Sequence, residues 1–168
     1  MLTKSAFLAG LLPTLAFSAI QHGPDPKALQ GKPMPKLDMA KSGGGTLSTA
    51  SLKGKVVVLD FWATWCAPCV GASPVMQKLY EKYAKKGLVI VGSNITDSPA
   101  KVAEYAKKHN YTFPFTSGNA PAAAKLGIQA IPVFLFIDRK GVVQRVDTGV
   151  DAGSPASWEK TIQSLLKS

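Results

Sequence analysis

The chain has 168 residues, of which 46% are hydrophobic and 18% are charged, and this is the balance of one globular domain with a buried core. Its formal net charge is +10, and most lysines fall on the outer faces of expected helices with few aromatic residues between them. This pattern indicates a solvated cationic surface, and it argues against a nucleic-acid-binding protein. Anionic membrane surfaces and acidic partners are the two kinds of contact that this charge leaves open.

The first 18 residues have the pattern of an export signal. Lys4 precedes an apolar run from Ala6 to Phe17, and small residues at Ala16 and Ser18 suit a signal peptidase. We therefore expect residues 1–18 to be cleaved and the mature protein to be soluble in the periplasm or another extracytoplasmic space. An uncleaved N-terminal membrane anchor is the alternative, although the run is short for a span of about 20 residues.

Residues 19–36 form a polar, Pro-rich segment, which predicts a linker or an extended arm before a domain at 37–168. At the start of that domain, Leu37–Met39 and Thr46–Ser48 flank three consecutive glycines. Two short apolar segments around such a turn predict a β-hairpin.

Residues 56–62 (VVVLDFW) predict a buried central strand that is apolar on both sides apart from Asp60. The only two cysteines, Cys66 and Cys69, follow this strand, and Pro68 between them suits the first turn of a helix. A cysteine at a helix N-terminus is favoured as the thiolate that attacks disulfides. We therefore expect Cys66 to be the attacking thiolate and Cys69, one helical turn later, to resolve the mixed disulfide.

Two alternative roles for the cysteine pair are weaker. A purely structural disulfide around a loop of about four residues contributes only roughly 2 kcal/mol in the chain-entropy estimate. A zinc site needs about four ligands, and the only histidines, His22 and His109, are far apart in the sequence. The spacing and the strand-to-helix setting therefore favour redox chemistry without a bound cofactor.

The rest of the chain alternates strands and helices and predicts an α/β fold with a central mixed sheet flanked by helices. Expected strands cover Leu88–Ile95 and Thr112–Phe115, and a hairpin covers Ile131–Asp138 and Val142–Val146. Expected helices follow Cys66 as far as Gly87 and run from about Ser98 to His109. Asn119-Ala120-Pro121 is expected to cap a small helix that stops at Gly127, and a closing amphipathic helix is marked by Trp158, Ile162, Leu165 and Leu166.

Several motifs together resemble the thioredoxin superfamily, and specifically its exported TlpA/ResA-like thiol-disulfide oxidoreductases. They are FWATWCAPC, an Asp six residues before the first Cys (Asp60), a Pro eight residues after it (Pro74), and a distant Ile131-Pro132 before VFLFID. The resemblance covers about residues 31–168. It implies a thioredoxin fold with an N-terminal hairpin and an insertion between the two halves.

The resemblance also implies roles for residues around the cysteines. Asp60 is expected to be a buried proton acceptor during resolution independently of the resemblance, because a carboxylate inside VVVLDFW is costly to bury and its pKa should rise. The resemblance makes Pro132 a cis-proline against the cysteine pair and Trp65 a wall of the site. The backbone of Ile131 pairs with an extended substrate segment. The implied partners are a disulfide-containing protein substrate and a membrane thiol-disulfide electron donor, and the protein is expected to be a monomer.

Two further function classes remain open from the sequence. A peroxiredoxin-like peroxidase has a related fold, but it needs an activating Thr and Arg where this chain has Pro68 and Cys69. A non-enzymatic copper-binding chaperone uses the two cysteines with a soft ligand such as Met34 or Met39.

Overall fold

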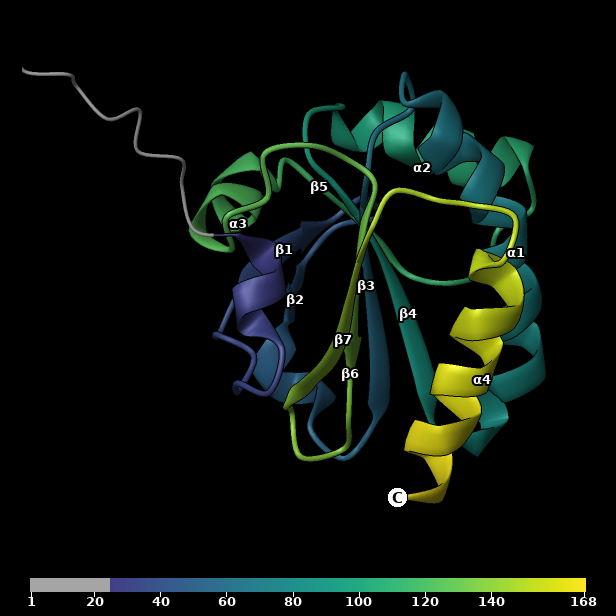
Figure 1. Ribbon diagram of the computed structural model, residues 1–168. Coiled ribbons are helices and arrows are strands. Elements are labelled where there is room, and N and C mark those ends of the chain that lie inside the picture. Colours follow the sequence, from purple (N-terminus) through teal and green to yellow (C-terminus); the bar gives the residue numbers. More distant parts are fainter. Residues whose placement is uncertain (1–24) are drawn as a thin grey trace, which may run out of the picture.

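The computed structural model describes residues 25–168, so the expected signal segment and residues 19–24 lie outside the described residues. Seven strands form one mixed sheet in the order β2-β1-β5-β4-β3-β6-β7 (Figure 1). The strands are β1 (Asp38–Lys41), β2 (Thr46–Ser48), β3 (Val56–Trp62), β4 (Leu88–Asn94), β5 (Phe115–Ser117), β6 (Val133–Ile137) and β7 (Val143–Thr148). The α-helices are α1 (Ala67–Tyr83), α2 (Pro99–Lys108), α3 (Ala120–Lys125) and α4 (Ser154–Lys167). None of the helices in this part of the chain has the length and apolar character needed to cross a membrane.

The β3 strand lies in the interior of this sheet, between β4 and β6, as its apolar sequence predicted. All seven of its residues are buried. It pairs in parallel with β4 on one side and antiparallel with β6 on the other, so that Leu59 lies opposite both Val91 and Leu135. The mixed α/β sheet expected from the sequence is therefore confirmed.

Helices cover both faces of the sheet (Figure 1). Helices α1, α2 and α4 pack on one face, where the large buried side chains include Trp62, Phe134 and Trp158. Helix α3 and the N-terminal segments cover the other face, around Leu59 and Leu135. Successive β3 side chains point to opposite faces, which explains why one strand supplies both cores.

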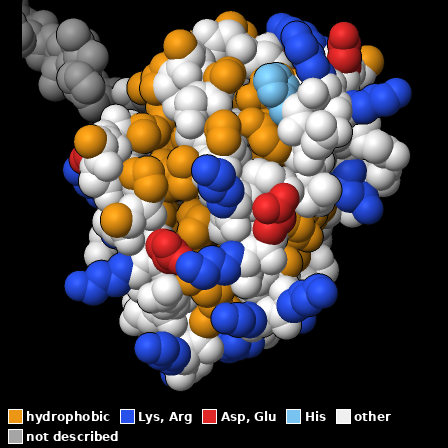
Figure 2. Space-filling view, turned by 90° about the vertical axis from the view of Figure 1, so that its right-hand side faces the viewer, with side chains coloured by type: hydrophobic (Ala, Val, Ile, Leu, Met, Phe, Trp, Pro, Cys, Tyr) orange, Lys and Arg blue, Asp and Glu red, His pale blue; other side chains and the backbone are white. Residues whose placement is uncertain are grey.

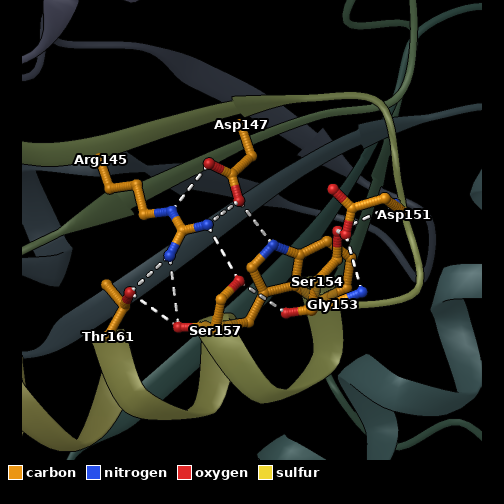
Figure 3. Close-up of polar contacts among 8 residues, drawn as sticks. Arg145, Asp147, Asp151, Gly153, Ser154, Ser157 and Thr161 are labelled. Carbon is orange, nitrogen blue, oxygen red and sulfur yellow. Dashed lines mark hydrogen bonds and ion pairs between the residues drawn. The ribbon is translucent and has the colours of Figure 1, made fainter.

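A polar network holds α4 against β7 (Figure 3). The guanidinium of Arg145 donates two hydrogen bonds of 2.7 Å to the Asp147 carboxylate and one of 2.9 Å to Thr161 on α4. The same carboxylate accepts a 2.7 Å bond from the indole N–H of Trp158, whose side chain is fully buried. Because the donors and acceptors of this network satisfy each other, its role is structural.

Lysine and arginine side chains are spread over the face formed by α1, α2 and α4, with few acidic side chains among them (Figure 2). One ion pair on this face joins Lys82 to Glu159 at 2.6 Å, and the lysine side chain is 60% exposed. Exposed pairs of this kind contribute little to stability. The arrangement fits the solvated cationic surface that the sequence predicted.

The N-terminal segments add an arm and a hairpin to the sheet. Strands β1 and β2 pair antiparallel, which confirms the predicted hairpin, and β1 also pairs with β5. Residues 25–36 run along β7, where Gly31 N–H donates to the Val143 carbonyl and Val143 N–H donates to the Lys32 carbonyl. The described part of the expected linker is therefore an arm that pairs with the outer edge of β7 at Val143, where the strand begins.

Three details differ from the sequence-based expectations. Helix α1 ends at Tyr83, and a short 3-10 turn (Ala84–Lys86) precedes the left-handed Gly87, because the last turn tightens before the chain reverses. The fifth strand begins at Phe115 rather than Thr112, since Pro114 has no N–H for a sheet ladder. Asn119 does precede α3, but its side chain donates to the Asn94 carbonyl instead of capping the helix.

Close packing against β4 leaves no room for a side chain at position 92, which explains the glycine there. A Cβ atom at this position would lie 2.6 Å from Cδ1 of Phe115 and 3.1 Å from Nε1 of Trp62. We expect Gly92→Ala to lower the free energy of unfolding by about 1–3 kcal/mol in urea denaturation, because one of the two rings must move. The matched control is Gly71→Ala in α1, where a Cβ meets nothing within 4 Å and a gain of about 0.5–1 kcal/mol is expected. An unchanged midpoint for Gly92→Ala would contradict this account.

Candidate functional site

Cys66 is the N-cap residue of α1, at the end of the loop that leaves β3. Its backbone is extended, and its Sγ atom lies 3.4 Å from the backbone nitrogen of Cys69, which donates to it. Pro68 occupies the first helical turn, where its missing N–H leaves no bond unmade. The sulfur atom of Cys66 therefore lies at the positive end of a helix of 17 residues.

Cys66 and Cys69 form a disulfide whose Cα atoms are 5.3 Å apart. Cys66 is 6% exposed and Cys69 is completely buried beneath it. An incoming thiol or disulfide therefore reaches the sulfur of Cys66 before that of Cys69. This asymmetry suits thiol-disulfide exchange, in which one sulfur attacks the partner and the other resolves the mixed disulfide.

The Ile131-Pro132 segment lies against this cysteine pair. The peptide bond between the two residues is cis, and the Ile131 carbonyl oxygen lies 3.9 Å from the Sγ atom of Cys66. The sheet register explains the approach, because β6 begins at Val133, which pairs with Phe61 near the end of β3. The chain entering β6 therefore passes the point where β3 leads to Cys66.

Trp65 projects from the cysteine loop and is 63% exposed. Its indole N–H donates a 3.0 Å hydrogen bond to Thr96 on the loop after β4. Together with residues from two other loops it lines a cavity of about 330 Å³; the lining residues are Trp65, Ile95, Ile128, Gln129, Ala130 and Ile131. Sequence reasoning identified Trp65 and Ile131 but not Ile95 or Ile128, because these look like ordinary core residues.

Asp60 lies on β3 with its carboxyl group inside the protein. It is 2% exposed, its Oδ1 atom has no hydrogen-bond partner among the described residues, and it faces Gly92 on β4 and Phe134 on β6. Burial raises the pKa of Asp60 to about 8, since no neighbouring cation among the described residues compensates the loss of water. The group can thus hold or release a proton near neutral pH.

Sequence reasoning missed Asp97, which lies on the loop between β4 and α2. Its carboxylate accepts hydrogen bonds from Thr64 in the cysteine loop, from Asn94 and from Lys101. Partial burial raises its pKa, but these hydrogen bonds from Lys101, Thr64 and Asn94 outweigh burial and lower the pKa to about 2. The sequence carried no signal for this contact, because an Asp before a Ser-Pro helix start is ordinary loop composition.

The residues around the cysteines do not complete a metal site or a peroxidase site. Within residues 25–168 there is no group of three or more His, Cys, Asp or Glu side chains placed to hold a metal. Met39 is buried on the opposite face of the sheet, and Met34 lines a cavity near the start of β3, far from the cysteines at its end. The only two arginines in the sequence, Arg139 and Arg145, hydrogen-bond elsewhere.

Comparison with known proteins gives consistent results. The Redoxin family matches residues 29–162. The thioredoxin-like protein YneN of Bacillus subtilis is 34% identical over 123 residues, which cover 71% of this chain and 72% of that protein. The thiol:disulfide interchange protein DsbE of Pseudomonas fluorescens biotype C is 36% identical over 128 residues, or 74% and 70% of the two chains. A thiol:disulfide interchange protein of the thioredoxin family from Chlorobium tepidum TLS is similar in structure, with a TM-score of 0.72, 28% identity, and coverage of 82% and 97%.

Proposed function

The chain belongs to the Redoxin family and is a TlpA/ResA-like thiol-disulfide oxidoreductase of the thioredoxin superfamily, and from this premise we propose that it reduces disulfides in exported proteins. One observation carries the proposal. The Cys66–Cys69 disulfide lies at a helix N-terminus, with Cys66 slightly exposed, at 6%, and Cys69 completely buried. A reductase needs this division between an accessible attacking sulfur and a protected resolving sulfur.

In the proposed reaction, the Cys66 thiolate attacks one sulfur of the substrate disulfide. The substrate S–S bond breaks, a Cys66–substrate disulfide forms, and the released substrate thiolate takes a proton from water. The Cys69 thiol then loses its proton to the Asp60 carboxylate and attacks Cys66. The second substrate thiolate leaves and is protonated, so two electrons have passed from the dithiol to the substrate.

Trp65 and the Ile131-Pro132 segment are the proposed substrate-binding residues. The positions of these residues support this assignment. Trp65 is exposed in the cysteine loop, and the Ile131 carbonyl oxygen lies 3.9 Å from the Sγ atom of Cys66. An extended substrate segment hydrogen-bonds to the Ile131 backbone as an added strand. Trp65 then covers the substrate side chain next to the reacting cysteine.

We also propose the cellular setting. The expected signal at residues 1–18 directs the chain to an extracytoplasmic space, where a monomer acts on folded or folding proteins. An oxidising compartment drives an exposed pair to the disulfide, so a membrane thiol-disulfide donor must return two electrons after each cycle.

A single-turnover assay tests the reductase proposal. Protein reduced with dithiothreitol and freed of reductant is mixed with insulin, and the insulin thiols are counted by alkylation and mass spectrometry. We expect one insulin disulfide to be reduced for each Cys66–Cys69 disulfide formed, whereas the oxidised protein leaves insulin intact. Consumption of hydrogen peroxide by the reduced protein at a comparable rate, with insulin unreduced, would favour the peroxidase class instead.

A further inference from the structure

One carboxylate, that of Asp97, accepts two hydrogen bonds from the loop that carries Cys66, although Asp97 lies on a loop from another part of the chain. Thr64 donates its backbone N–H to Asp97 Oδ2 at 2.8 Å and its hydroxyl to Asp97 Oδ1 at 3.0 Å. Thr64 lies two residues before Cys66, and Asp97 is only 8% exposed. We propose that Asp97 is a positioning residue, which holds Cys66 at the N-terminus of α1 in the geometry that favours its thiolate.

The loop that provides this carboxylate is itself held by hydrogen bonds. The side-chain oxygen of Asn94 accepts the N–H groups of Thr96 and Asp97 at 3.1 and 2.7 Å, and its amide nitrogen donates to Asp97 Oδ2 at 2.8 Å. Thr96 in turn accepts the indole N–H of Trp65 at 3.0 Å. The segment 94–97 thus contacts both of the residues that immediately precede Cys66. Because Asn94 ends the central β4 strand, the position of the cysteine loop is set by the sheet and not only by its own helix.

Charge and position have opposite effects on Cys66, so they can be separated. Replacing Asp97 with a neutral residue removes a negative charge and leaves the Lys101 cation, 2.7 Å from Asp97, without this carboxylate. Both changes favour a nearby thiolate. Loss of the Thr64 bonds acts in the other direction, because Cys66 Sγ is then no longer fixed 3.4 Å from the Cys69 N–H at the helix terminus. Two further ionisable residues belong to the elements next to Cys66: Cys69, its disulfide partner on α1, and Asp60 on β3, the strand that leads into the cysteine loop.

The test compares Asp97→Asn with Lys101→Met in the reduced full chain. Asparagine keeps the shape of the side chain but loses one of the two acceptor oxygens that Thr64 uses. We expect alkylation of Cys66 by iodoacetamide at about pH 6 to slow about tenfold, because a smaller fraction of the sulfur is then present as thiolate. We also expect kcat for insulin reduction to fall with little change in KM. Lys101→Met keeps the Thr64 bonds and should change both rates by less than about twofold.

Faster alkylation in Asp97→Asn would show that charge dominates and would overturn the proposal, as would an unchanged pH profile of alkylation. If Asp97→Asn does not fold, Thr64→Val removes only the 3.0 Å hydroxyl bond and must shift the profile in the same direction by a smaller amount. The inference rests on the proposed attack by Cys66. Alkylation of the parent protein distinguishes a failure of that proposed function from a failure of the role given to Asp97. Slow alkylation of Cys66 in the parent protein contradicts the proposed function, whereas fast alkylation there and in Asp97→Asn contradicts only the role of Asp97.

Discussion

Cys69→Ser is expected to accumulate a covalent disulfide with its protein substrate, whereas Cys66→Ser is expected to accumulate none. In Cys69→Ser the accessible Cys66 still attacks, but the resolving sulfur is absent. In Cys66→Ser the remaining sulfur belongs to Cys69, which is completely buried. Steady-state turnover should fall by roughly three orders of magnitude or more in both variants, as when a catalytic nucleophile is removed.

The trapped species is measured by non-reducing electrophoresis and mass spectrometry after incubation with insulin. The control is the double variant Cys66→Ser, Cys69→Ser, which must give no adduct. Equal trapping by the two single variants would contradict the assignment of roles. A Cys66 adduct that also forms in the parent protein and persists would mean that Cys69 does not resolve it.

Asp60→Asn should slow the second step of the reaction and leave the first step almost unchanged. Burial raises the pKa of the Asp60 carboxyl group to about 8, so the ionised fraction present near neutral pH can accept a proton from Cys69 in the proposed second step. An amide cannot accept that proton. We expect the resolution rate at about pH 7 to fall by a factor of roughly 10² to 10⁴, the usual contribution of a general base.

Stopped-flow measurement of both steps across about pH 6 to 9 tests this prediction, since that interval brackets the thiol pKa. The rate of attack by Cys66 is measured from the formation of the mixed disulfide in the Cys69→Ser background, where the resolution step is absent. Asp151→Asn is a matched control, because that carboxylate is at the surface and outside β3. A resolution rate that is the same in Asp60→Asn and the parent at every pH would leave Asp60 with a structural role only.

The same substitution should change the stability of the oxidised protein in a pH-dependent way. The folded pKa of Asp60 is about 8, above the ordinary value of 3.8 in the unfolded chain, so the folded state binds more protons between these values. The contribution of Asp60 to stability is therefore fully present below about pH 4 and is lost as the pH rises to about 8. We expect Asp60→Asn to be more stable than the parent protein by a few kcal/mol near pH 8, with the difference shrinking toward pH 4.

Urea denaturation at several pH values measures this difference. A constant difference across that pH range would mean that Asp60 ionises in the folded protein as it does in water. Gln30→Asn, a change at an exposed position of the N-terminal arm, provides a baseline for pH effects that do not involve Asp60.

The sequence alone determined the elements whose signals are local. The run VVVLDFW has apolar side chains on both sides of an extended chain, so it predicts a strand that is buried on both faces, and β3 is that strand. Cys66 and Cys69 are placed by helix geometry, because Pro68 and the first turn of α1 bring residues three apart onto one side. Asp60 was also identifiable, because burying an isolated acid inside such a strand costs free energy, and a residue kept at that cost is a candidate for a functional role.

Only the tertiary structure decided what surrounds the cysteines. Cys66 and Ile131 are separated by 65 residues, and their contact depends on the register between β3 and β6. The bonds between Thr64 and Asp97 depend in the same way on the pairing of β3 with β4. Residue type and spacing describe interactions within one strand or one turn of helix, whereas a contact between distant segments is set by sheet register and packing, which a single sequence does not encode locally.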